Sequence, residues 1–250
     1  MSGHSKWHQI QHKKGILDAK RGAKFTKAAR VVTVAARKGG GDPATNPSLR
    51  TAIEKAKEIN MPNANIERAI KNGTGELKEG LIIEEVAYEA YGHNGVALLI
   101  HVVTDNKNRA VSEVKNILTK HGGSMGAAGC TAWMFDQKGI IHIDAAGKNV
   151  DDLELAAIDS GAEDIKRDGD AVEIYSRPHD VAAVREKLIS LGYSATPSEI
   201  AYVPKTEVKI TDEATARKIL KLMDTLEDFE DVTQVASNFD ISAEIMEKIS

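Results

Sequence analysis

The spacing of apolar residues changes once along this chain, close to Gly73-Thr74-Gly75. Before this point apolar residues recur every three or four positions, which is typical of helices that bury one face. After it, short runs rich in β-branched residues alternate with stretches of helical spacing, which is typical of sheets covered by helices. The pattern therefore predicts a small helical domain followed by α/β structure.

Three helices are predicted before the change. The first spans about 17–38, the second begins at Pro47 after Asn46, and the third ends at Gly73-Thr74-Gly75. Asn46 followed by Pro47 is a strong start signal, because the Asn side chain caps free backbone N–H groups and Pro has none to satisfy. Each helix has one apolar stripe, so we expect a bundle over roughly 17–73.

The first predicted helix separates apolar from cationic side chains. Its apolar stripe consists of Phe25, Ala28, Ala29, Val32 and Ala36. Residues 4–41 hold ten Lys or Arg and one acid, a net charge of +9, whereas the whole chain sums to −4. A row of cations with so few acids favours a polyanion such as a nucleic-acid backbone, the alternative being a solvated helix face.

We predict that this segment binds nucleic acid through its cations and one aromatic residue: Lys6, Trp7, Lys13, Lys14, Lys20, Arg21, Lys24, Lys27, Arg30, Arg37 and Lys38. Trp7 lies between cations, where it can stack on an unpaired base or pack on its own domain. The loop of Gly39, Gly40 and Gly41 is expected to approach the nucleic acid closely.

The rest of the chain is predicted to form two α/β domains. Residues 139–204 read as β-α-β-β-α-β, and the flanking segments each supply half of a second unit of this kind. The predicted fold class is therefore α/β (α+β), with a three-helix bundle in 1–78, a middle domain in 79–136 plus 206–250, and a ferredoxin-like domain in 137–205 inserted into it. A strand is expected at 131–136, with Trp133 in the core.

Residues 72–250 carry a net charge of −14. One cluster of acids is Glu227-Asp228-Phe229-Glu230-Asp231. Acidic surfaces usually serve solubility, and the alternatives are repulsion of nucleic acid from one side or docking of a basic partner.

Three motifs resemble functional sites but lack the neighbouring residues or elements that such sites need. The glycine-rich segment 122–129 follows a predicted helix, the reverse of a phosphate-binding loop, so a conformational linker is favoured over a nucleotide site. Cys130 has no readable His partner, which favours a packed thiol. His4, His8 and His12 could share a helix face, but nearby lysines repel a metal cation. We therefore predict no catalytic residue, no metal, no cofactor and no enzymatic activity.

The location is predicted from cysteine use and apolar runs. A single cysteine, Cys130, forms no internal disulfide and indicates a reducing compartment. The longest apolar run, at 96–100, is too short for a bilayer, and the N-terminal segment has no signal-peptide pattern. We expect a cytoplasmic protein without membrane contact.

Several short motifs resemble one family. They are Gly3-His4-Ser5-Lys6-Trp7, His12-Lys13-Lys14-Gly15, Asp18-Ala19-Lys20-Arg21-Gly22, Gly39-Gly40-Gly41-Asp42-Pro43, Asn65-Ile66-Glu67-Arg68-Ala69-Ile70, Tyr88-Glu89 and Thr104-Asp105-Asn106. With these motifs the sequence resembles the YebC/PmpR family over essentially its full length, although His8 and Cys130 depart from the family's pattern. The resemblance implies three domains with a helical N-terminal one, and the description of probable transcriptional regulators that bind DNA. The family is also similar to the mitochondrial translational activator of cytochrome c oxidase subunit I, and a ribosome-associated role relieving stalled translation is attributed to it.

Three functions follow as hypotheses. The first is a non-enzymatic, DNA-binding transcriptional regulator. The second is a ribosome-associated translation factor that binds ribosomal or transfer RNA. The third is a protein-interaction scaffold. If about six phosphates are neutralised, log affinity for nucleic acid should fall with log salt at a slope of about −5. The oligomeric state is left open.

Overall fold

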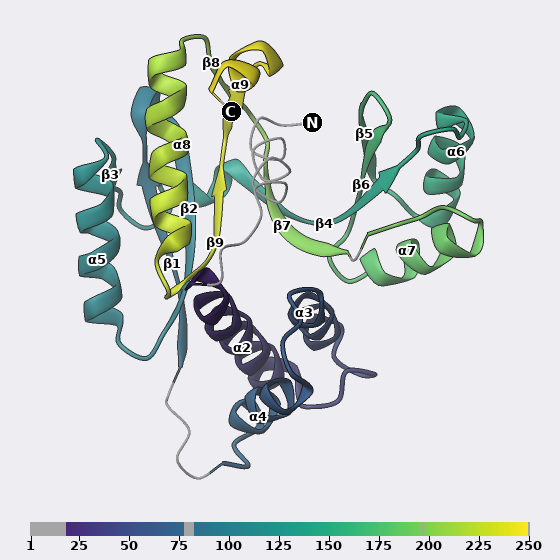
Figure 1. The fold of residues 1–250 in the computed structure, drawn as a ribbon, viewed down its shortest axis with the longest axis horizontal. Helices are drawn as coiled ribbons and strands as arrows, with labels where there is room; N and C mark the ends of the chain where they lie inside the picture. Colours follow the sequence, from purple (N-terminus) through teal and green to yellow (C-terminus); the bar gives the residue numbers. More distant parts are fainter. Residues whose placement is uncertain (1–18, 78–82, 197, 250) are drawn as a thin grey trace. The chain divides into compact units, whose positions relative to one another are not determined.

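The computed structural model describes residues 19–77, 83–196 and 198–249 (Figure 1). It divides into two compact units, one formed by Asp136–Val203 and the other by the chain on both sides of that segment. The larger unit contains the helical bundle and a four-stranded sheet. The smaller one has its own sheet and its own hydrophobic core.

The bundle consists of α2 (Ala19–Gly39), α3 (Pro47–Glu58) and α4 (Asn63–Thr74), close to the predicted boundaries. Asn46 caps α3 as expected, because its side chain accepts a hydrogen bond from the Leu49 N–H at 3.1 Å. α2 packs against both other helices. Their common core includes Val32, Leu49 and Ala56.

The four-stranded sheet of the larger unit is antiparallel, in the order β3-β1-β2-β9. Its strands are β1 (Glu84–Tyr91), β2 (Ala97–Thr104), β3 (Ser124–Met125) and β9 (Val232–Ser237). α5 (Lys107–Lys120) and α8 (Glu213–Asp228) lie side by side on one face and share its core (Figure 1). A two-stranded parallel sheet of β8 (Val208–Ile210) and β10 (Phe239–Ile241) and the helix α9 (Ala243–Ile249) complete the unit.

The smaller unit has the predicted β-α-β-β-α-β sequence. Its elements are β4 (Phe135–Asp144), α6 (Val150–Ser160), β5 (Asp164–Asp168), β6 (Ala171–Ser176), α7 (Val181–Ser190) and β7 (Glu199–Pro204). The strand order is β5-β6-β4-β7, so the first strand is central and the two helices pack on one face. The predicted class, a helical N-terminal domain followed by α/β structure, is confirmed.

The two central strands of the larger unit's sheet, β1 and β2, form an antiparallel pair joined by the short 3₁₀ helix η1 (His93–Gly95), where the sequence predicts two strands and a turn. The order of the other strands differs from the expected β-α-β-β-α-β unit. β8 lies outside that sheet and pairs with β10. The segments on either side of the smaller unit therefore do not form a second β-α-β-β-α-β unit, although their helices and strands are mostly where the sequence indicates.

The predicted strand at 131–136 is wrong. The chain forms a short 3₁₀ helix, η2 (Ala132–Met134), before β4 begins. The N–H groups of Thr131 and Ala132 bind the Glu89 carboxylate, so they are not available to a sheet. Trp133 is 63% exposed rather than in the core, and its indole N–H donates to the Cys130 carbonyl at 3.1 Å.

Candidate nucleic-acid interface

α2 uses one face for the bundle core, as its apolar spacing indicates. Val32 and Ala36 are buried, and Phe25, Ala28 and Ala29 are partly buried against the same core. Ala35, which the predicted stripe omits, is buried as well. The cations of α2 therefore project to its other sides.

A second face of α2 is docked on the acidic segment 227–231 at the C-terminal end of α8. The Lys27 ammonium donates to the backbone carbonyl of Glu227. The Arg30 guanidinium forms an ion pair with Asp231 and donates to the Glu230 carbonyl at 3.2 Å. The cluster at 227–231 thus binds cations of its own chain. An acidic surface is expected to serve solubility, repel nucleic acid or dock a basic partner, and here the basic partner is α2.

Asp231 is the centre of this contact. Its side chain is only 2% exposed, and it accepts hydrogen bonds from Arg30, from Arg109 at 2.9 Å and from Thr104 at 2.8 Å. Burial acts to raise the pKa of the Asp231 carboxyl, but the hydrogen bonds from Arg109, Thr104 and Arg30 outweigh burial, so the pKa lies below its ordinary value. Asp231 therefore stays ionised and holds α2 against the sheet.

The pKa of the Glu227 carboxyl shifts in the opposite direction to that of Asp231. Burial raises the pKa of its carboxyl to about 8, against the attraction of Lys27 and with support from Asp224 and Asp228. Burial also lowers the pKa of Lys27, while Glu227 and Asp228 act to raise it. Lys27 is consequently an interior cation of this contact.

The other predicted cations divide into three groups. Lys24 is exposed and forms no ion pair with any described residue. Arg37 donates to the Ile83 carbonyl, and Lys38 forms an ion pair with Glu85, although both side chains reach solvent. Outside the described part of the chain lie Lys6, Trp7, Lys13 and Lys14, the side chains of Lys20 and Arg21, and His4, His8 and His12.

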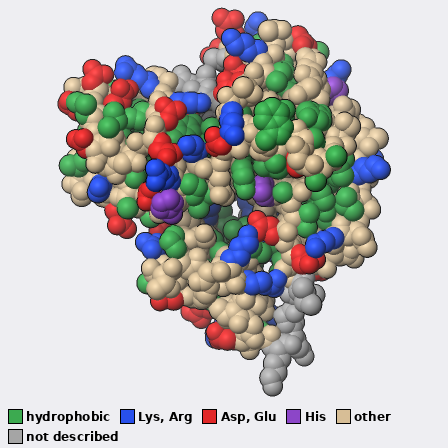
Figure 2. Space-filling view, turned by 180° about the vertical axis from the view of Figure 1, so that it is seen from behind, with side chains coloured by type: hydrophobic (Ala, Val, Ile, Leu, Met, Phe, Trp, Pro, Cys, Tyr) green, Lys and Arg blue, Asp and Glu red, His purple; other side chains and the backbone are tan. Residues whose placement is uncertain are grey.

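The bundle presents further exposed cations outside the predicted set. Lys57 on α3 and Arg68 and Lys71 on α4 are exposed, and none forms an ion pair with a described residue. The sequence feature that could have identified them is the net charge of +10 over residues 1–71, because this positive region includes α3 and α4 as well as α2. On the face shown in Figure 2, blue Lys and Arg side chains alternate with red Asp and Glu over much of the surface. Unpaired cations are therefore more informative than the total charge.

The structure explains why glycine occupies positions 39 and 40, at the end of α2. A Cβ on Gly39 would lie 2.6 Å from the Asn46 amide nitrogen, and Gly40 has φ +87. The Asn46 amide donates to the carbonyls of Ala35 and Gly40, both at 2.8 Å. Close approach of this loop to nucleic acid remains a prediction.

The glycine-rich segment 122–129 leads to a group of backbone donors that is already occupied. The Glu89 carboxylate accepts hydrogen bonds from the N–H groups of Gly129 at 2.5 Å, Thr131 at 2.5 Å and Ala132 at 2.7 Å. Burial acts to raise the pKa of Glu89, but these hydrogen bonds lower it. The backbone from Gly129 to Ala132 therefore binds an anion, but this anion is a side chain of the same protein.

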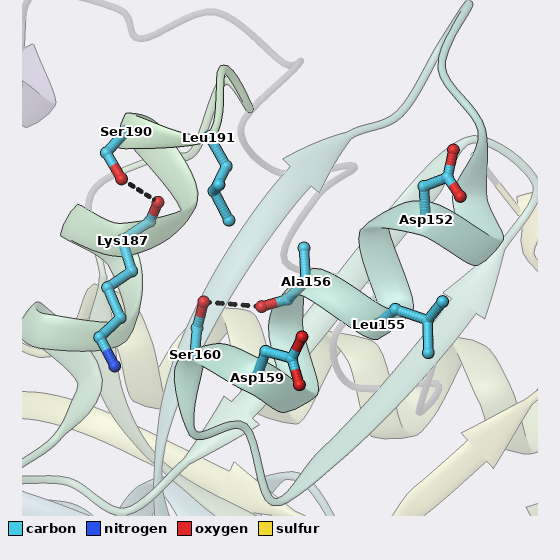
Figure 3. A pocket seen from close by; sticks show the side chains of 8 residues that line it. All are labelled: Asp152, Leu155, Ala156, Asp159, Ser160, Lys187, Ser190 and Leu191. Atoms are coloured by element: carbon cyan, nitrogen blue, oxygen red, sulfur yellow. Dashed lines mark hydrogen bonds between the residues drawn. The ribbon is translucent and has the colours of Figure 1, made fainter.

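A hollow of about 570 Å³ lies between α6 and α7 in the smaller unit (Figure 3). Its hydroxyl groups are engaged within their own helices, since Ser160 donates to the Ala156 carbonyl and Ser190 to the Lys187 carbonyl. Among the described residues that line the hollow there is no His, and neither hydroxyl donates to Asp152 or Asp159. Within the described residues no group of His, Cys, Asp and Glu has the arrangement of a metal site, and no helix combines the length and apolarity needed to cross a membrane.

Comparison with known proteins identifies relatives along the whole chain. Two family models match, described as the TACO1/YebC protein N-terminal domain over residues 5–76 and the TACO1/YebC second and third domain over residues 83–239. A probable transcriptional regulatory protein of Trichlorobacter lovleyi is 53% identical over 249 residues, and one of Persephonella marina is 51% identical over 251 residues. Each alignment covers 100% of both chains.

A solved structure shows the same fold. The crystal structure of a conserved hypothetical protein from Aquifex aeolicus matches with a TM-score of 0.81 at 47% identity, covering 92% of this chain and 94% of that one. The names of the relatives are regulatory, not enzymatic. The motifs, the three-helix N-terminal domain and these full-length matches together establish that the chain belongs to the TACO1/YebC family.

Proposed function

We propose that this protein is a non-enzymatic regulator of gene expression whose helical bundle binds the phosphates of nucleic acid. The observation that carries the proposal is a set of exposed cations without ion-pair partners among the described residues: Lys24, Lys57, Arg68 and Lys71. Such cations release counter-ions when they meet a polyanion, which favours binding. The names of the relatives support a regulatory role.

The leading target is DNA, as expected of a transcriptional regulator. The exposed cations lie on three helices, Lys24 on α2, Lys57 on α3, and Arg68 and Lys71 on α4. Contacts of this kind position a protein on a phosphate backbone but do not read base sequence. We therefore expect weak sequence preference on duplex DNA. Contacts to phosphates alone are equally suited to structured RNA, so ribosomal or transfer RNA is the second candidate target.

The partner and location proposals follow from this role. The bundle would contact nucleic acid, and the middle and inserted domains of the three-part division would present the protein to the transcription or translation machinery. A ribosome is the expected partner if the target is RNA. The single Cys130 supports a reducing, cytoplasmic location.

The decisive test compares two triple charge reversals. Lys24→Glu, Arg68→Glu and Lys71→Glu together remove unpaired cations of the bundle. Lys115→Glu, Lys187→Glu and Lys209→Glu change the net charge equally at exposed sites elsewhere. Binding to labelled duplex DNA and to structured RNA is measured by fluorescence anisotropy at several salt concentrations, and binding to ribosomes by co-sedimentation.

We expect the bundle variant to lose at least tenfold in affinity and the control to lose much less. The wild-type salt slope should be several units and should fall by about 0.7–0.9 for each phosphate contact removed. Equal losses in both variants would refute the bundle as the binding surface. Preference for ribosomes over DNA would identify a translation factor. Protein partners retained after nuclease treatment, without nucleic-acid binding, would identify a scaffold.

A further inference from the structure

A hollow of about 270 Å³ in the larger unit is lined by basic residues from three elements. Its lining consists of His93, Lys120, His121, Gly122, Lys218 and Lys221. We call this set the α5–α8 basic pocket. None of the described residues that line it is acidic. In a chain with a net charge of −4, a hollow surrounded only by Lys, His and Gly is unusual.

The local folds explain how these residues meet. Lys120 ends α5, and His121 and Gly122 follow it directly. His93 comes from the turn η1 between β1 and β2. Lys218 and Lys221 lie three residues apart on α8, so they occupy the same side of that helix. α5 and α8 pack side by side, and this brings their cations to one place.

One member of the pocket is held in position by backbone geometry. Gly122 has φ +71, and a Cβ there would lie 2.5 Å from Cε1 of His93. The half-buried imidazole of His93 therefore packs directly on the Gly122 backbone. Gly122 satisfies both requirements, because it accepts a left-handed conformation and leaves room for the ring. The His93 side chain is thus fixed at the wall of the pocket.

The ammonium groups of the pocket have no ion-pair partners among the described residues. This holds for Lys120, Lys218 and Lys221. Asp212, whose carboxylate caps α8 by accepting from the Thr215 N–H at 2.8 Å, interacts electrostatically with Lys218. Asp212 attracts Lys218 but does not line the pocket.

Helix stabilisation accounts for only part of this arrangement. Cations in the last turn of a helix offset its dipole, which explains Lys120 and His121 at the end of α5. Lys218 and Lys221 lie in the middle of α8, where the dipole offers no such benefit and two like charges at this spacing are unfavourable. An external anion removes this repulsion.

We propose that the α5–α8 basic pocket binds a phosphate group. Three ammonium groups and two imidazoles from separate elements suit an anion that accepts several hydrogen bonds at once. A phosphodiester of the bound nucleic acid would make the pocket a second contact point, and in this form the inference rests on the proposed function. A free phosphate or phosphorylated small molecule offers the same chemistry.

The test uses full-length protein and a matched pair of variants. Lys218→Glu with Lys221→Glu reverses charge in the pocket. Lys115→Glu with Lys209→Glu makes the same change at exposed residues outside it. One arm titrates inorganic phosphate and follows the imidazole NMR signals of His93 and His121. The other measures the affinity of labelled RNA and duplex DNA over a salt series.

We expect phosphate to shift both imidazole signals in wild type and control but not in the pocket variant. For nucleic acid we expect the pocket variant to lose at least fivefold more affinity than the control and about one unit of salt slope. A response to inorganic phosphate alone would support the pocket and assign it to a free ligand. Identical behaviour of both variants in both arms would overturn the proposal. Wild type that binds phosphate but no nucleic acid would refute the proposed function and leave the pocket supported.

Discussion

Glu227 and Asp231 lie four residues apart in the segment that receives α2, and their pKa values move in opposite directions. Asp231 has three hydrogen-bond donors around its carboxylate, which lower its pKa despite burial. Burial dominates at Glu227 and raises its pKa to about 8. The donors at Asp231 therefore outweigh burial, whereas burial prevails at Glu227, and the two acids differ in their ionisation near neutral pH.

Glu227→Gln should reduce the pH dependence of stability. A carboxyl whose pKa is higher in the folded than in the unfolded protein stabilises the fold most below the unfolded pKa, and this contribution disappears as pH rises through the folded pKa. Wild type should therefore lose stability relative to Glu227→Gln between about pH 4.5 and 8, by about 1–3 kcal/mol.

Thermal denaturation of both proteins from pH 5.5 to 8.5 measures this difference. The exposed acid Glu207, changed to Gln, is the control and should leave the pH profile of wild type unchanged. A constant difference in Tm between Glu227→Gln and wild type across this range would contradict the assigned burial of Glu227.

At the scale of elements, local signals predicted most boundaries. The start of α3 follows from Asn46 and Pro47, and β9 begins and ends where its β-rich run does. The errors have non-local causes. Residues 131–134 do not form a strand because Glu89, about forty residues earlier, binds the N–H groups of Thr131 and Ala132. The short strand β3 forms only because Ala90 and Tyr91 of β1 pair with it.

The candidate site shows the same limit. A helical wheel indicates that Lys27 and Arg30 leave the apolar face of α2, and this is correct. It contains no information about a partner 200 residues later, so it could not separate these docked cations from exposed Lys24. Exposed cations on α3 and α4 were missed because their spacing forms no continuous row.

Asn46→Ala should destabilise the bundle by about 2–3 kcal/mol. The buried Asn46 side chain caps α3 at Leu49 and also donates to the carbonyls of Ala35 and Gly40, so its loss leaves several buried groups without partners. Asn46→Ser keeps a capping oxygen and should cost less.

The matched control is Asn106→Ala, which removes an exposed cap of α5 with one hydrogen bond to the Arg109 N–H. Its cost should be about 1 kcal/mol. Urea denaturation of the three variants measures these differences. If Asn46→Ala cost no more than Asn106→Ala, the two extra hydrogen bonds of Asn46 would not contribute to stability.

At the scale of the whole molecule, the chain leaves the larger unit and returns to it at adjacent points, Met134 and Lys205. The Lys205 N–H donates to the Met134 carbonyl at 2.8 Å, so the two chain ends at the boundary are already side by side. The cores of the two units consist of different residues.

A chain in which residues 136–203 are replaced by a short glycine linker should therefore fold. We expect amide NMR signals from the cores of the bundle and the four-stranded sheet to keep their wild-type dispersion. Collapse of this dispersion would show that the larger unit depends on the smaller one. Replacement of residues 98–135 by the same linker, which removes most of β2 together with α5 and β3, is the control and should prevent folding.

The docking of α2 also changes how many charges a nucleic acid would meet. Lys27 and Arg30 already have oxygen partners on the same polypeptide. A group tethered in this way acts at an effective concentration of millimolar or above, and a phosphate from solution must exceed it to take its place. Counter-ions leave a nucleic acid only where a cation of the protein neutralises one of its phosphates, which Lys27 and Arg30 do not do while they bind their own chain. The salt dependence of binding should consequently count the exposed cations of the bundle and leave these two residues out.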